Sequence, residues 1–253
     1  MDFLGTPDVG PLLFFGLAAA SFVTAFIAVF TGAAGGVILL AIMATVMPPA
    51  VVVPLHTVVM LGTGFSRSVM MWRHVMKSTV LPFTIGAAIG GAAGAKVVVA
   101  LPPGWLQAIL GGFILLVTWM PKLGQVGAER GRFAFLGFGT TFIGVFVSAT
   151  GTLLAPFVAS AAKDRYIHAA TLGALMTITH IAKLAAFVFV GFAVGSFAPL
   201  MAAMIVTGAA GNWIGEVALH HTPEQSFRLV LKLTLTALAL RLLWVAAREL
   251  GWF

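Results

Sequence analysis

The chain has 253 residues, of which 60% are hydrophobic and only 8% are charged, and its mean hydropathy is +1.09. A soluble protein carries about 25% charged residues, so this composition excludes a water-soluble domain and indicates an integral membrane protein. Apolar stretches recur along the whole chain, and we therefore expect an all-α polytopic membrane protein. The net charge is +7, which we attribute to cytoplasmic loops rather than to nucleic-acid binding, since no basic patch with interleaved aromatics is present.

The first half of the chain contains one long apolar segment, a break of small residues, and then further apolar segments. The long segment covers 11–30, and its length of about 20 residues suffices to span a bilayer as a helix. A glycine-rich stretch and a short apolar segment follow, and then come three predicted spans. These elements lie at 32–36, 37–47, 51–72, 80–101 and 105–119.

The second half repeats this plan. An apolar segment, a small polar break and a short apolar segment are followed by three long segments, at 133–146, 148–152, 153–162, 167–194, 197–219 and 227–244. The longest polar connection separates the halves. We therefore expect an N-terminal transmembrane repeat at 1–121, a cytoplasmic linker at 122–132 and a C-terminal transmembrane repeat at 133–253.

A direct sequence match supports the duplication. The stretch 142–152 is identical to 26–36 at six of eleven positions and lies 116 residues later. At the same offset Met60 matches Met176, and the cation Arg67 matches the cation Lys183. We therefore predict two structural repeats of four to five hydrophobic segments, each starting with a broken or re-entrant helix pair.

Loop charges predict the orientation. The loops at 73–77, 121–132 and 163–165 are basic and should face the cytoplasm, whereas the turns at 48–50, 101–104 and 195–197 carry no charge. If each broken pair returns to the side on which it started, the two repeats are inverted. Both termini are then periplasmic, and the protein is a multi-pass protein of the bacterial inner membrane.

The two small-residue breaks are the predicted binding site. Interrupted helices at equivalent places in two halves are the best sequence pointer to a transporter's site. The break 32–36 exposes backbone, and the helix that follows it presents free N–H groups to an anion. The break 148–152 adds the hydroxyls of Ser148, Thr150 and Thr152. The alternative is that these glycines only allow close helix packing.

Ionisable residues within the spans indicate the sign of the ligand. A charge inside a span faces a cavity or a partner by default, and the spans of the first half contain no acid to neutralise Arg67. Lys183 lies near the middle of its segment, and His180 lies one helical turn before it on the same face. Unneutralised cations suggest an anionic substrate. The predicted substrate-binding residues are Gly32, Gly35, Gly36, His56, Thr57, Arg67, Ser148, Thr150, Gly151, Thr152, His180 and Lys183, and the candidates for coupling transport to an ion are His180, Asn212 and Glu216.

These predictions have alternatives. Either histidine could instead be satisfied by a backbone carbonyl, and Arg67 could reach the interface. Asn212 and Glu216 could form an interfacial hydrogen-bonded pair. No nucleophile elbow, zinc-protease motif, P-loop or paired aspartates occur. We therefore expect no enzyme, no cofactor and no bound metal.

The breaks, the two-half plan and the proline after the short segment 37–47 together resemble the sulfite exporter TauE/SafE family, also called the TSUP family. The resemblance covers nearly the whole chain, although Ala33 and Ala34 depart from the denser glycine run of the family. It implies a secondary transporter that exports a small sulfur-containing anion, such as sulfite, sulfoacetate or a related organosulfonate, by alternating access. The anion would lie between the two breaks. An anion channel and a membrane-embedded enzyme are the alternatives, and the glycine faces could also support a homodimer.

Overall fold

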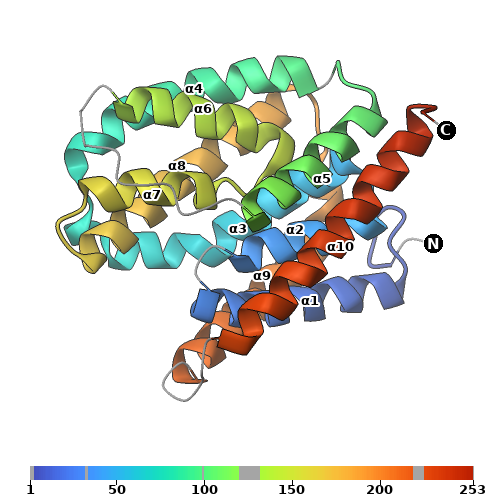
Figure 1. Ribbon diagram of the computed structural model, residues 1–253, viewed down its shortest axis with the longest axis horizontal. Helices are drawn as coiled ribbons and strands as arrows, with labels where there is room; N and C mark the ends of the chain where they lie inside the picture. Colours follow the sequence, from blue (N-terminus) through green and yellow to red (C-terminus); the bar gives the residue numbers. More distant parts are fainter. Residues whose placement is uncertain (1–2, 32–33, 99, 120–131, 219–224, 253) are drawn as a thin grey trace. The chain divides into compact units, whose positions relative to one another are not determined.

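The structure is a computed structural model that describes residues 3–31, 34–98, 100–119, 132–218 and 225–252. Within these ranges, the side chains of 29–31, 34, 66–70, 165, 194, 216, 218, 225–232 and 234 lie outside the description. The described residues form ten α-helices and no strand (Figure 1). The helices are α1 (Pro11–Thr31), α2 (Ala34–Val46), α3 (Pro49–Met70), α4 (Lys77–Val98), α5 (Pro103–Trp119), α6 (Arg132–Val147), α7 (Gly151–Ala161), α8 (Arg165–Phe189), α9 (Ala198–Ala218) and α10 (Gln225–Glu249).

The helix lengths and compositions confirm an all-α polytopic membrane protein. Four apolar stretches of the described helices are long enough to cross a bilayer, at Pro11–Ala28, Lys77–Val98, Tyr166–Phe189 and Gly195–Gly215. α5 is apolar over 17 residues, which is the lower limit for a span. α2 and α7, the short helices after the two breaks, have 13 and 11 residues, and these lengths are too short to cross a bilayer alone.

The chain divides into two compact units that each draw on both sequence halves. Unit 1 contains Met1–Val59, Pro102–Trp119 and Ala193–Phe253, and unit 2 contains Met60–Leu101 and Met120–Phe192. α3 therefore begins in unit 1 and ends in unit 2. The division into an N-terminal and a C-terminal repeat remains a prediction.

In unit 1, α1 packs along α9, and α5 packs along α10. Thr207 Oγ1 on α9 donates to the Ala18 carbonyl on α1 at 2.8 Å, and one turn later Gly211 lies against the Phe22 carbonyl. The residue numbers of the two helices increase in the same direction along this contact, so α1 and α9 are parallel. A side chain at Gly211 would meet the α1 backbone, so glycine is what allows this approach.

In unit 2, the glycine face of α4 packs on α6. A Cβ atom at Gly86 would meet the Ala134 carbonyl, and one at Gly90 would meet the Phe138 carbonyl. The contacts advance in the same direction along both helices, so α4 and α6 are also parallel. The predicted orientation requires parallel directions for both of these helix pairs. Gly86 and Gly90 of α4 and Gly211 of α9 therefore pack within the chain.

Large apolar side chains cover the outer surface of the helices. Leu12 is 90% exposed, Phe135 80% and Phe189 87%. In water such a surface would associate, whereas hydrocarbon solvates it at no cost. This distribution is the one expected of helices that face lipid.

Candidate functional site

The second break lies in unit 2, where α6 ends and α7 begins. Ser148 terminates α6 in the left-handed region, with φ +57°, and its N–H donates to the Gly144 carbonyl at 2.8 Å. A left-handed conformation is unfavourable for a residue with a side chain, so the surroundings must hold Ser148 in place. α7 starts three residues later, at Gly151.

Lys183 of α8 helps to hold Ser148 in this conformation. Its side chain is 0% exposed, and Nζ donates to the Ser148 carbonyl at 3.0 Å and to Ser148 Oγ at 3.2 Å. The carbonyl groups at the end of a helix have no hydrogen-bond donor within that helix. The amine of Lys183 therefore caps the end of α6 across a sequence separation of 35 residues.

The start of α7 offers further hydrogen-bond donors. The hydroxyls of Thr150 and Thr152 are buried and have no hydrogen-bond partner among the described residues. Buried polar groups in native proteins are normally paired. A break with two unpaired hydroxyls in one place therefore suits a ligand that accepts hydrogen bonds.

These groups converge on Gly144 of α6. A Cβ atom added there would lie 3.1 Å from Lys183 Cδ and 3.5 Å from Thr150 Oγ1, so Lys183 and Thr150 approach the same short length of backbone. Gly151 lies beside Met176 of α8, because a Cβ atom there would be 3.6 Å from the Met176 sulfur. Gly144 was not among the predicted site residues, although its alignment with another small residue, Ala28, in the repeat was visible in the sequence.

No carboxylate lies near Lys183 among the described residues of unit 2. The acidic residue described there is Asp164, which caps the start of α8 by accepting from the N–H groups of Tyr166 and Ile167 at 2.8 and 2.9 Å. Lys183 lies 19 residues further along the same helix, which corresponds to about 28 Å. The site thus combines a basic group with unpaired hydroxyl donors and has no described carboxylate of this unit beside it. Its charge and its hydrogen-bond donors complement an anion.

The first break, in unit 1, has a different character. A Cβ atom at Gly35 would meet the Thr24 carbonyl and Ala28 of α1, so this glycine allows the close packing of α1 and α2. His56 Nε2 lies 2.9 Å from the Gly36 carbonyl, and its side chain is 0% exposed. This contact corresponds to the backbone-carbonyl alternative stated above for a buried histidine.

The other predicted residues are placed as follows. Thr57 is buried and donates to the Val53 carbonyl one turn earlier, at 2.7 Å. His180 is 6% exposed and precedes Lys183 by one turn on α8. Asn212 is half-buried on α9. Gly32 lies outside the described residues, and so do the side chains of Arg67 and Glu216.

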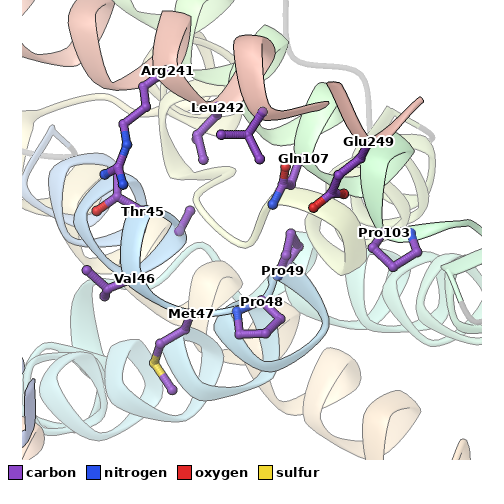
Figure 2. Close-up of a pocket in the computed structure, with 12 residues that line it drawn as sticks. Thr45, Val46, Met47, Pro48, Pro49, Pro103, Gln107, Arg241, Leu242 and Glu249 are labelled. Carbon is purple, nitrogen blue, oxygen red and sulfur yellow. The ribbon is translucent and has the colours of Figure 1, made fainter. Parts of the chain in front are cut away.

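Sequence reasoning missed one cavity, of about 290 Å³, in unit 1. It lies where the α2–α3 turn, the start of α5 and the last turns of α10 meet, and Figure 2 shows its lining. Gln107, Arg241 and Glu249 are its polar residues with long side chains. A glutamine inside an apolar segment and an arginine in the last one were the available sequence signals. Among the described residues, no group of His, Asp or Glu could hold a metal ion.

Comparison with known proteins supports the same class of function. The family described as "Sulfite exporter TauE/SafE" matches residues 17–242, which include all of α2 to α9 and most of α1 and α10. No curated protein and no solved structure matches the chain. The family match confirms the resemblance seen in the breaks and the two-half plan. The chain therefore belongs to the TauE/SafE family of sulfite exporters and is a multi-pass membrane transporter.

Proposed function

We propose that the protein exports a small sulfur-containing anion, such as sulfite, sulfoacetate or a related organosulfonate, across the bacterial inner membrane by alternating access. The observation that carries this proposal is the second break. The Lys183 amine, the unpaired hydroxyls of Thr150 and Thr152, and the start of α7 lie there together. These donors bind the oxygen atoms of the anion, and the amine supplies the positive charge.

Three arguments favour an oxyanion over a cation or an apolar substrate. The start of a helix carries a partial positive charge of about half an elementary unit. Threonine hydroxyls and amide N–H groups can donate to an oxyanion without a change of protonation. A cation would meet the Lys183 amine with no carboxylate to offset it among the described residues of this unit, and an apolar molecule would leave the buried hydroxyls of Thr150 and Thr152 unpaired.

The membrane potential favours export. With the cell interior negative by 100 mV, each unit of negative charge is driven outward by about 2.3 kcal/mol. A carrier for an anion can therefore expel its substrate without a coupled ion. Coupling of transport to an ion through His180, Asn212 or Glu216 remains a prediction, as do the inverted repeats, the binding of the anion between the two breaks and a homodimer.

Counterflow of radiolabelled sulfite tests the proposed function. Proteoliposomes containing the purified protein are loaded with unlabelled sulfite, diluted into labelled sulfite, and followed for transient accumulation of label. A carrier with alternating access gives saturable uptake that overshoots equilibrium and then declines. A channel gives linear flux without overshoot, and that result would refute alternating access.

The orientation has a separate test, because the chain has no cysteine. Single cysteines are introduced at Lys163, in a predicted cytoplasmic loop, and at Ser196, in a predicted periplasmic turn. A membrane-impermeant maleimide applied to intact cells should label the position 196 variant and spare the position 163 variant until the cells are lysed. The reverse pattern would invert the predicted topology.

A further inference from the structure

The cavity in unit 1 has two chemically different ends. Figure 2 shows Arg241 of α10 beside Thr45 at one side, and Glu249 of α10 beside Gln107 of α5 at the other. Arg241 and Glu249 are eight residues apart on one helix, which separates their backbones by about 12 Å along its axis. One end therefore presents a guanidinium donor, and the other presents a carboxylate and an amide.

The Thr45 hydroxyl donates to the Ile42 carbonyl at 2.7 Å, whereas the three long polar side chains that line this cavity have no partners in the described part of the chain. Gln107 Oε1 is buried and accepts no hydrogen bond. The side chains of Arg241 and Glu249 make no ion pair or hydrogen bond with another described residue. A buried acceptor without a donor is costly, so the acceptor end is suited to a ligand that brings N–H groups.

The packing of α5 on α10 fixes the position of the acceptor end. A Cβ atom at Gly104 would lie 3.2 Å from Glu249 Cβ and 3.0 Å from Leu250 Cγ, so the last turn of α10 lies against the first turn of α5. Gln107 follows Gly104 by one turn of α5. Glu249 and Gln107 are thus held together by helix packing rather than by a loop.

The size of the cavity limits what it can hold. A volume of about 290 Å³ is at the lower limit for ligand pockets. It admits a small molecule or a headgroup and excludes a large organic ligand. Pro48, Pro49 and Pro103 form its wall at the helix ends, on the side that the loop charges predict to be periplasmic.

We propose that this cavity binds a short zwitterion, with its oxyanion on Arg241 and its primary ammonium on Glu249 and Gln107. Two sources supply this chemistry: a free molecule such as phosphoethanolamine, or the headgroup of phosphatidylethanolamine in the outer leaflet. A quaternary ammonium has no N–H group, so phosphatidylcholine lacks the donor that Gln107 Oε1 requires. The site is separate from Lys183 and the second break, and it depends on no part of the transport proposal.

The test measures binding to purified protein in nanodiscs of phosphatidylcholine. Phosphoethanolamine is titrated by calorimetry against wild type, Arg241→Gln, Glu249→Gln and the control Arg248→Gln. The control makes the same charge change as Arg241→Gln on the same helix, and Arg248 is exposed, as Arg241 is, but does not line the cavity. In a second arm, phosphatidylethanolamine replaces part of the phosphatidylcholine, and the apparent melting temperature is recorded.

The two sources give different results. A free zwitterion predicts saturable binding of phosphoethanolamine that weakens about tenfold in both cavity variants and stays unchanged in Arg248→Gln. A headgroup site predicts a rise in melting temperature with phosphatidylethanolamine that only the cavity variants lose. Binding of glycerol phosphate, which has no ammonium, as strongly as phosphoethanolamine would overturn the proposal. It would also be overturned if neither probe bound, or if Arg248→Gln behaved like Arg241→Gln.

Discussion

Replacement of Lys183 by methionine separates two contributions of this residue at the second break. The amine caps Ser148 through the bonds of 3.0 and 3.2 Å to its carbonyl and hydroxyl, and in the proposed function it also supplies charge to the anion. Methionine has a similar length and keeps the apolar stem buried, so the substitution removes the amine with little change of volume. The double variant Lys183→Met/Ser148→Gly then tests whether Lys183 acts only by holding residue 148 in its left-handed conformation.

The structure sets the expected magnitudes. Loss of the amine removes both hydrogen bonds from Lys183 to Ser148, at a cost of about 1–3 kcal/mol in the free energy of unfolding. Glycine at position 148 adopts φ +57° without strain, and this regains about 1–2 kcal/mol. Loss of one charge-assisted hydrogen bond to the anion costs about 1.5–3 kcal/mol, which corresponds to sulfite binding weakened by about 10–150-fold.

The assay compares stability and sulfite affinity in the same preparations. Denaturant unfolding in detergent reports stability, and the sulfite dependence of the thermal shift reports affinity. We expect Lys183→Met to lower both quantities, and Ser148→Gly to restore stability without restoring affinity. If the double variant regained sulfite affinity, Lys183 would act only through the conformation of Ser148. If Lys183→Met bound sulfite like wild type, the proposed site would be wrong.

Three further substitutions test other parts of the account. Thr150→Val removes an unpaired buried hydroxyl and keeps the shape of the side chain. Sulfite affinity should therefore fall by about tenfold, while thermal stability is unchanged or raised. A loss of stability without loss of affinity would show that the hydroxyl has a structural partner. Gly86→Ala should destabilise the α4–α6 contact by about 1–3 kcal/mol in denaturant unfolding, because its methyl would meet the Ala134 carbonyl. Its control is Gly112→Ala, which meets nothing within 4 Å, and equal effects of the two would contradict the packing. His56→Phe should lower the free energy of unfolding by about 0.5–1.5 kcal/mol, because it removes the hydrogen bond of the imidazole to the Gly36 carbonyl, and denaturant unfolding measures this loss. Retained stability with lost transport would instead assign His56 to the substrate.

The sequence was sufficient for the helices and for the class of protein. Uncharged stretches of spanning length and proline-marked turns predict helices wherever they occur, because an unpaired backbone cannot exist in lipid. The predicted segment 80–101 corresponds to α4 (Lys77–Val98), and 197–219 corresponds to α9 (Ala198–Ala218). The glycine spacing in α4 also predicted a close-packing face, and the structure places Gly86 and Gly90 against the α6 backbone.

The partners of individual side chains could not be predicted. Glycines in the two breaks look alike in the sequence, yet Gly35 packs against α1 and Gly151 lies beside Met176. Which role a glycine has depends on the helix that lies opposite, and this is a tertiary property. In the same way, no sequence rule predicts that Lys183 caps Ser148 rather than facing an open cavity.

The cavity between α2, α5 and α10 illustrates the same limit. Gln107 and Arg241 were visible in the sequence as polar interruptions of apolar segments, but they are 134 positions apart. Only the packing of the first turn of α5 on the last turn of α10 brings Gln107 beside Glu249. Long-range packing of helices was therefore the missing information, whereas local helix signals were adequate.

The central claim is that a sulfur oxyanion is carried through the site formed by Lys183 and the start of α7. Counterflow of radiolabelled sulfite into proteoliposomes tests it most directly, with wild type compared with Lys183→Met and with Lys96→Met, which removes a cation from an exposed position on α4. The account predicts a saturable overshoot for wild type and for Lys96→Met, and none for Lys183→Met at the same sulfite concentration. An overshoot of equal size in Lys183→Met would contradict it.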